Sequence, residues 1–298
     1  MGDVVFKYTT LLFAVIVLGL IVLMGFEMYE GSMESIAKFG WGFLGSSVWD
    51  PVQDTYGALP FIFGTVVSSA LALVISLPLS LGVAIFLSEL APSYLERPLS
   101  FLIELLAGIP SIVYGLWGVF VLVPWIRTAV EPAISKTVGF LPIFHGAPYG
   151  FGMLAAGLIL SVMVLPIVAS ISRDVLKSVP QTQREASLGL GATRWQSIRL
   201  ILRDARSGIV GATLLGLGRA IGETMAVTMV IGNRPTITAS LFDPAYTMAS
   251  VLANEFTEAT SSMYVSALVE IALLLFVVTI IVNMLARLLV WSVTRGNR

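Results

Sequence analysis

The chain has 298 residues, of which 57% are hydrophobic and only 12% are charged, and its formal net charge is −1. Soluble domains carry about 25% charged residues, so this composition excludes an ordinary water-soluble domain and indicates a protein that uses the lipid bilayer as its solvent. The chain contains no cysteine and one histidine, which excludes a disulfide framework and a thiolate metal site.

Six stretches are apolar enough, and long enough at roughly 20 residues, to cross a membrane as helices. They cover residues 8–26, 61–87, 101–126, 151–172, 208–231 and 265–289. The first stretch has no small-residue cleavage site before the acidic segment 27–34, so we interpret it as a retained span and not as a signal peptide. Because no soluble domain or linker separates the spans, we predict an all-α polytopic membrane protein whose residues 1–298 form one transmembrane domain.

The basic residues predict which side of the membrane each connection faces. Seven of the 17 basic residues lie in residues 173–206, so we expect this loop to be cytoplasmic. Segment 27–54 carries five acidic residues and one lysine, which suits the outside. The chain end adds Arg287, Arg295 and Arg298 to the cytoplasmic side. Six spans then place both termini in the cytoplasm, as in a multi-pass protein of the cell (inner) membrane.

The loop 173–206 has the pattern of two short helices joined by a bend. Gly189 and Gly191 permit a sharp corner, because glycine accepts backbone angles that other residues avoid. After the corner, Trp195, Ile198 and Leu202 repeat at helical spacing among arginines. This second segment is typical either of an interfacial helix that lies on anionic lipid or of a plug that docks into a partner protein. The fixed corner favours docking.

The chain offers no nucleotide-binding loop of its own. A Walker A motif needs glycine immediately before its lysine, and none of the four lysines follows a glycine. We therefore expect no catalytic residue, cofactor or metal site in this chain, and we expect any ATP chemistry to come from a partner subunit.

Two charged residues, Arg219 and Glu223, lie near the middle of the fifth span. Their four-residue spacing places them on one face of a helix, and each charge costs roughly 2.5–3.5 kcal/mol at mid-membrane. They form either a structural salt bridge or a substrate pathway site. In a pathway, the planar fork of Arg219 suits a tetrahedral oxyanion, and Glu223 orients it or competes with the anion.

Small residues in the same span fall into two rows at four-residue spacing. One row contains Gly218, Gly222 and Ala226, and the other contains Gly208, Ala212 and Gly216. Small residues let helix backbones approach closely, so we expect this span to be buried between other helices.

The loop resembles the cytoplasmic signature of permease subunits of ATP-binding-cassette importers, which reads Glu-Ala-Ala, three residues, Gly, nine residues, then Ile-x-Leu-Pro. Glu185, Ala186, Gly191 and Ile201 match this signature, Ser187 stands for the second alanine, and Arg203-Asp204 replaces Leu-Pro. The resemblance implies a MetI-like permease fold and a loop that inserts into the ATPase. We assign ATPase coupling to a set of seven residues: Glu185, Ala186, Gly189, Gly191, Trp195, Ile198 and Ile201.

Three further segments, residues 85–92, 104–118 and 219–233, resemble phosphate-importer permeases of the PstC type. Met225-Ala226-Val227 and Gly232-Asn233 are closer to this type than to the sister PstA type. The resemblance implies a PstA-type partner permease, two PstB-type subunits that bind ATP and Mg, and an extracytoplasmic PstS-type phosphate-binding protein. It also implies inorganic phosphate as substrate, with membrane lipid around the chain and no role for nucleic acid.

The residues leave three alternatives open. The cargo could be another oxyanion, such as sulfate or molybdate. A secondary transporter would run on an ion gradient without ATP. A membrane scaffold would use the basic loop only to recruit a cytoplasmic protein, and would leave Arg219 and Glu223 a role in packing alone.

Overall fold

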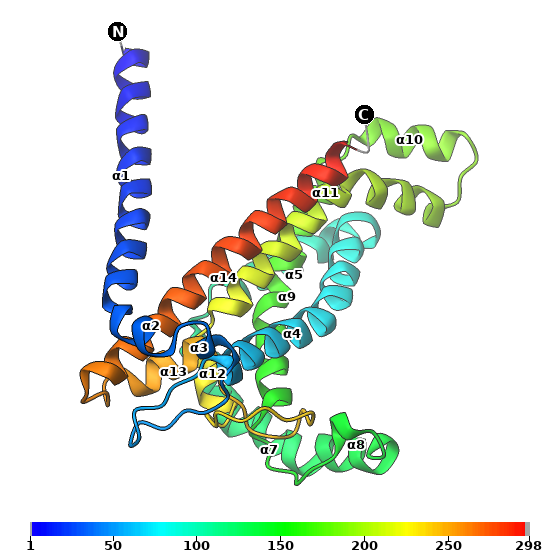
Figure 1. Cartoon of the computed structure of the whole chain (residues 1–298). Helices are drawn as coiled ribbons and strands as arrows, with labels where there is room; N and C mark the ends of the chain where they lie inside the picture. Colours follow the sequence, from blue (N-terminus) through cyan, green and yellow to red (C-terminus); the bar gives the residue numbers. More distant parts are fainter. Residues whose placement is uncertain (1, 296–298) are drawn as a thin grey trace.

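The computed structural model describes residues 2–295, and Arg298 and the side chain of Arg295 lie outside what it describes. Apart from an isolated β-bridge between Asp50 and Thr55, the regular structure of the described residues is helical. Along the chain the elements are α1 (Gly2–Gly31), α2 (Met33–Phe39), α3 (Gly42–Gly45), α4 (Leu59–Ile85), the π-helical η1 (Phe86–Leu90), α5 (Ser93–Ala107), α6 (Ser111–Trp117), the π-helical η2 (Gly118–Leu122), α7 (Val123–Trp125), the π-helical η3 (Ile126–Val130), α8 (Glu131–Val138), the 3-10 turn η4 (Pro142–Phe144), α9 (Met153–Ser178), α10 (Gln181–Gly189), α11 (Arg194–Gly222), α12 (Met225–Val230), α13 (Met248–Glu255) and α14 (Ser262–Arg295) (Figure 1).

Five helical stretches among the described residues are long and apolar enough to cross a membrane. They are Gly2–Gly31, Leu59–Leu90, Ser111–Val138, Met153–Ser178 and Ser262–Trp291. They correspond to the first, second, third, fourth and sixth predicted spans. The predicted all-α polytopic class is confirmed, and the third and fifth spans differ from the prediction in ways that matter for the site.

The predicted third span, 101–126, is not one helix. Helix α5 ends at Ala107, and a new helix begins at Ser111 after Pro110. Proline disfavours a helical conformation in the residue before it, which is why the apolar run divides here. The Tyr114 hydroxyl donates to the carbonyl oxygen of Leu106 at 2.8 Å and fixes the corner between the two helices.

The prediction that a short helix precedes the fifth span, 208–231, as a separate element was also wrong. Both belong to α11, which runs unbroken from Arg194 to Gly222. The family's Leu-Pro stands here as Arg203-Asp204, so no proline interrupts the helix. Helix α11 stops where Glu223 adopts an extended backbone, with φ −72° and ψ 122°, and the short α12 completes the span.

Helix α9 is the centre of the bundle. It packs against α4, α11 and α5, and most of its residues are buried. The main hydrophobic cluster includes Ala156, Ile159 and Val164 of α9. By contrast, α1 has no buried residue and touches the rest of the bundle mainly through α14 and α2. Its apolar surface is left to lipid or to another chain.

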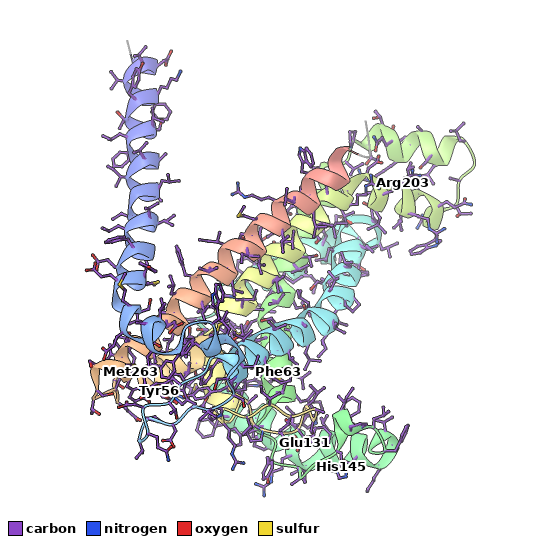
Figure 2. The ribbon with its side chains drawn as sticks, viewed as in Figure 1. Tyr56, Phe63, Glu131, His145, Arg203 and Met263 are labelled. Carbon is purple, nitrogen blue, oxygen red and sulfur yellow. The ribbon has the colours of Figure 1, made fainter. Side chains whose placement is uncertain are left out.

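The two ends of the molecule differ in character. The beginning of α1, the end of α14 and helix α10 lie at one end (Figure 1). Arg203 marks this basic end in Figure 2, whereas Tyr56, Glu131 and His145 lie at the opposite end. The predicted outer connections therefore share one end of the bundle, and the basic loop lies at the other.

An aromatic cluster fixes the chain at the end opposite to α10. The Trp49 indole and the Tyr264 hydroxyl both donate to Oε2 of Glu255 at 2.7 Å. The rings of Tyr56 and Tyr264 stack with centroids 5.5 Å apart. This packing fastens segment 46–58 to α13 and α14, and so gives this end a fixed surface.

The two rows of small residues in α11 have different surroundings. A Cβ built on Gly216 would lie 2.7 Å from Cγ2 of Val168, so the row that contains Gly208, Ala212 and Gly216 packs tightly on α9 as expected. A Cβ on Gly218 or Gly222 would meet nothing within 4 Å. The expected burial of this second row is therefore met only at Ala226, which is 0% exposed, whereas Gly218 and Gly222 face open space.

Gly216→Val should destabilise the isolated chain, whereas Gly218→Val should not. Overpacking a tight contact costs about 1–3 kcal/mol, and the valine at position 218 has room. Both substitutions change the same helix in the same way, so their difference isolates the contact with α9. Thermal unfolding of the detergent-purified chain would measure the effect. Equal unfolding midpoints for the two variants would contradict the close packing of α11 on α9.

Candidate functional site

Helix α10 and the first turns of α11 form a hairpin, residues 181–205, that projects from the bundle (Figure 1). Its turn depends on Gly191, which has φ +84°, a left-handed conformation that side chains disfavour. Thr193 then starts α11 with a capping box. Its Oγ1 accepts the Gln196 N–H, and Oε1 of Gln196 accepts the Thr193 N–H at 2.8 Å. Thr-x-x-Gln is a readable capping signal that the sequence analysis missed.

The seven residues assigned to ATPase coupling divide into two groups. Glu185, Ala186, Gly189, Gly191 and Trp195 are exposed. Ile198 and Ile201 are 7% and 1% exposed, and Ile201 packs with Ala84, Leu176 and Val179 from the ends of α4 and α9. The first group is free to meet a partner, whereas Ile198 is buried and Ile201 packs against the ends of α4 and α9.

The free surface of the hairpin is apolar at its tip. Leu190 is 90% exposed and Trp195 is 59% exposed. A groove of about 520 Å³ runs between α10 and α11 and is lined by Gln183, Ala186, Ser187, Leu190, Ala192, Gln196, Leu200 and Asp204. Exposed apolar patches rimmed by polar residues are typical of protein interaction sites. This surface favours docking over a purely structural loop.

Sequence reasoning did not single out the two residues that tie the hairpin to the bundle, Arg184 and Glu89. Arg184 Nε and Nη2 donate to the two carboxylate oxygens of Glu89 at 3.2 and 2.9 Å. The same guanidinium donates to the carbonyl oxygens of Leu176 and Val179 at 2.8 and 2.5 Å. Because 95 residues separate the pair along the chain, no local pattern connects them.

A second group of ion pairs joins α9 to α5 near the same end of the molecule. Arg173 Nη2 lies 3.0 Å from Oε1 of Glu104, and Lys177 pairs with Glu96. The Lys177 ammonium holds the pKa of Glu96 below its usual value through a side-chain hydrogen bond. These pairs do not involve the hairpin helix α10.

Arg219 and Glu223 do not form the arrangement that their spacing predicts. Arg219 is exposed in the last turn of α11, and the described part of the structure gives it no hydrogen bond or ion pair. Glu223 lies beyond the helix end, is 8% exposed, and accepts the Ala226 N–H at 3.4 Å. An intrahelical salt bridge between them is therefore wrong, because the helix stops before Glu223 and the carboxylate turns inward.

The surroundings of Arg219 leave its guanidinium available. The backbone of α12 comes close to α6 at Gly115, where a Cβ would lie 3.2 Å from Cα of Ala226. An unpaired guanidinium can present a fork of N–H donors to a planar or tetrahedral oxyanion.

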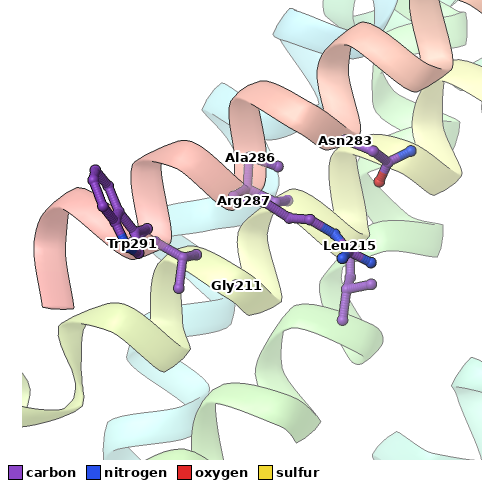
Figure 3. A pocket seen from close by; sticks show the side chains of 8 residues that line it. Gly211, Leu215, Asn283, Ala286, Arg287 and Trp291 are labelled. Atoms are coloured by element: carbon purple, nitrogen blue, oxygen red, sulfur yellow. The ribbon is translucent and has the colours of Figure 1, made fainter.

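One face of α11 stays uncovered along its length. Gly211, Leu215, Gly218, Arg219 and Gly222 repeat at helical spacing on it, and the three glycines have no neighbour within 4 Å of a built Cβ. At Gly211 and Leu215 this face borders a groove of about 480 Å³ against Asn283, Ala286, Arg287 and Trp291 of α14. Figure 3 shows Arg287 reaching along this groove toward Leu215. A second chain could close over this face.

The comparisons with known proteins identify the family. A model of the binding-protein-dependent transport system inner membrane component matches residues 76–293. The chain belongs to this family. The matched region includes the hairpin, α11 and most of the bundle, and it leaves out α1, α2 and α3. Members of this family are membrane subunits of transport systems that work with a binding protein.

Individual relatives narrow the family to its PstC branch, as predicted. The phosphate transport system permease protein PstC of Haemophilus influenzae is 48% identical, over 98% of this chain and 95% of its own length. A probable PstC of Methanocaldococcus jannaschii is 36% identical, over 94% of this chain and 91% of its own. A crystal form of the MetNI methionine ABC transporter in an inward-facing conformation contains a chain with a TM-score of 0.61. At 18% identity, covering 83% of this chain and 99% of that one, it shows the MetI-like fold alone.

Proposed function

We propose that this chain is the membrane subunit of an ATP-driven phosphate importer and forms half of its inward anion pathway. The proposal rests on the two functional features that lie at opposite ends of the single helix α11. Its first turns belong to an exposed docking hairpin, and its last turn carries the unpaired Arg219 on an uncovered face. The similarity to PstC proteins supports phosphate as the anion.

The uncovered faces of the bundle suit a set of partners. A PstA-type sister permease would cover the open face of α11 and complete the pathway. Two PstB-type subunits would bind ATP and Mg and receive the hairpins. A PstS-type binding protein would deliver phosphate to the end that carries the aromatic cluster. This arrangement places the hairpin and both chain ends in the cytoplasm, in agreement with the basic residues near them.

In this proposal the chain itself makes no covalent step. The Arg219 guanidinium contacts the phosphate oxygens as the anion passes. The Glu223 carboxylate stays buried and does not compete with the anion for this guanidinium. A site in a pathway must bind the anion weakly enough to release it. The glycines beside Arg219 leave the anion room, because they add no side chain to that face.

Reconstitution tests the proposal. The chain, its sister permease and the ATPase subunits are placed in proteoliposomes, and labelled phosphate uptake is measured with the binding protein and ATP. We expect uptake that needs both additions and that excess sulfate or molybdate does not reduce. Uptake of sulfate or molybdate instead would assign another oxyanion. Uptake by this chain alone on an ion gradient would favour a secondary transporter, and no uptake of any anion would favour a scaffold.

A further inference from the structure

The Arg184 guanidinium joins three segments that are far apart along the chain. It projects from α10, pairs with Glu89 in η1 at the end of α4, and donates to the carbonyl oxygens of Leu176 and Val179 at the end of α9. Arg184 adds two hydrogen bonds at the end of α9, where the Leu176 carbonyl oxygen also accepts the Val179 N–H at 3.3 Å, and it neutralises Glu89. One side chain therefore connects the hairpin to two spans.

The chemistry of the pair makes this connection specific. The side chains of Arg184 and Glu89 are 14% and 9% exposed, so water competes weakly with their hydrogen bonds. The guanidinium fork meets both carboxylate oxygens at once, which a lysine ammonium cannot reproduce. Loss of either partner leaves the other charge buried without compensation. The pair thus resists separation in a way that a surface ion pair does not.

The pair links α10 to the end of α4, which has no direct backbone connection to α10. The backbone joins α10 directly to α9 and α11, whereas α4 meets this region only through side chains. Ala84 of α4 packs with Ile201 and Ala205 of α11 in an apolar cluster. The Glu89–Arg184 ion pair adds a polar attachment of fixed geometry between α10 and the end of α4, beside this apolar packing.

We propose that Arg184 and Glu89 are positioning residues that carry hairpin movement to the ends of α4 and α9, and so couple ATP hydrolysis to transport. The inference rests on the proposed function, because it takes the hairpin as the ATPase docking site. It predicts a separation of two activities. Without the pair, the ATPase still binds the exposed tip and hydrolyses ATP, but the spans follow its movement poorly.

The test compares phosphate uptake and ATP hydrolysis in the same proteoliposomes of the full complex. In Glu89→Gln and Arg184→Lys, we expect uptake per ATP hydrolysed to fall about tenfold, within the range of coupling between sites. Copurification of the ATPase should stay unchanged. Lys177→Gln is the matched control, because it breaks an ion pair at the same end that joins α9 to α5 and not to α10. Its uptake per ATP should equal that of the unmodified complex.

A rescue experiment separates the connection from a general loss of folding. The chain contains no cysteine, so Glu89→Cys with Arg184→Cys can be bridged selectively by a short, cleavable bifunctional thiol reagent when the partner subunits are also free of cysteine. We expect low uptake per ATP before bridging, recovery after bridging and loss again after cleavage.

Two results would overturn the inference. One is unchanged uptake per ATP in both Glu89→Gln and Arg184→Lys, or an equal fall in Lys177→Gln. The other is a bridged cysteine pair that does not recover uptake. If the unmodified complex shows no ATP-dependent uptake, the proposed function fails instead, so the two failures are distinguishable.

Discussion

Replacing Arg219 with glutamine should strongly reduce phosphate uptake and leave the assembled complex intact. Arg219 is exposed at the end of α11 and has no partner within the described chain, so its removal disturbs no internal contact. A hydrogen bond to a charged group contributes about 1.5–3 kcal/mol, which corresponds to a roughly 10- to 150-fold fall in uptake. The initial rate of labelled phosphate uptake into proteoliposomes measures this effect.

Two variants serve as controls for Arg219. Arg219→Lys keeps a point charge but loses the fork, so we expect an intermediate rate. Glu223→Gln changes a buried carboxylate that accepts the Ala226 N–H, so it should reduce uptake less than Arg219→Gln does. Unmodified uptake in Arg219→Gln, with the complex assembled, would remove this arginine from the pathway.

Gly191→Val should release the ATPase from the membrane subunits, whereas Gly189→Ala should release it much less, because it adds one methyl group at a helical position of the same docking surface. Gly191 has φ +84°, and an L-residue in a left-handed conformation costs roughly 1–2 kcal/mol. If the turn opens to relieve a strain of about 1.4 kcal/mol, the hairpin conformation that docks becomes about tenfold less populated. The fraction of complexes that retain the ATPase should fall by the same factor. Gly189 ends a helix and a Cβ there meets nothing within 4 Å, so alanine should stabilise α10 by about 0.5–1 kcal/mol.

Copurification of the ATPase subunits with the membrane pair measures both effects in one experiment. The two glycines lie in the same turn, so expression and insertion should be alike for the two variants. If Gly191→Val keeps its ATPase and its uptake, the hairpin does not dock as proposed. If Gly189→Ala also loses its ATPase and its uptake, then any added side chain on this exposed surface prevents docking, and the left-handed turn at Gly191 is not the cause.

Hydropathy predicted the spans well because burial in lipid is a property of a continuous run of residues. It could not place helix ends, which depend on single residues. Pro110 divides the third predicted span, and the absence of a proline at 203–204 joins two segments that were expected to be separate helices. The signature of the cytoplasmic loop predicted the exposed hairpin but not which of its members face inward. Ile198 shares the helical spacing of the exposed Trp195 and yet is buried, and Ile201 is buried against the ends of α4 and α9, which the sequence does not place.

The charged residues show a second limit. Spacing within one helix predicted that Arg219 and Glu223 share a face, and this failed because α11 ends between them. Arg184 and Glu89, which do form an ion pair, are 95 residues apart in the sequence. Its recognition requires knowledge of which helix ends meet. The assignments of Arg219 to the pathway and of the hairpin to the ATPase stay predictions until the variants are measured.

The unbroken course of α11 makes it a lever. Arg194 begins α11 and Arg219 lies in its last turn. The 25 residues between them correspond to about 37 Å along the helix axis. Gly208 and Gly216 hold the helix against α9 between those ends, at a natural fulcrum. A tilt of about 10° about Gly208 would displace Arg219, about 16 Å along the helix, by about 3 Å. Because no loop lies between the hairpin and Arg219, a rotation of the hairpin would move the proposed anion contact directly.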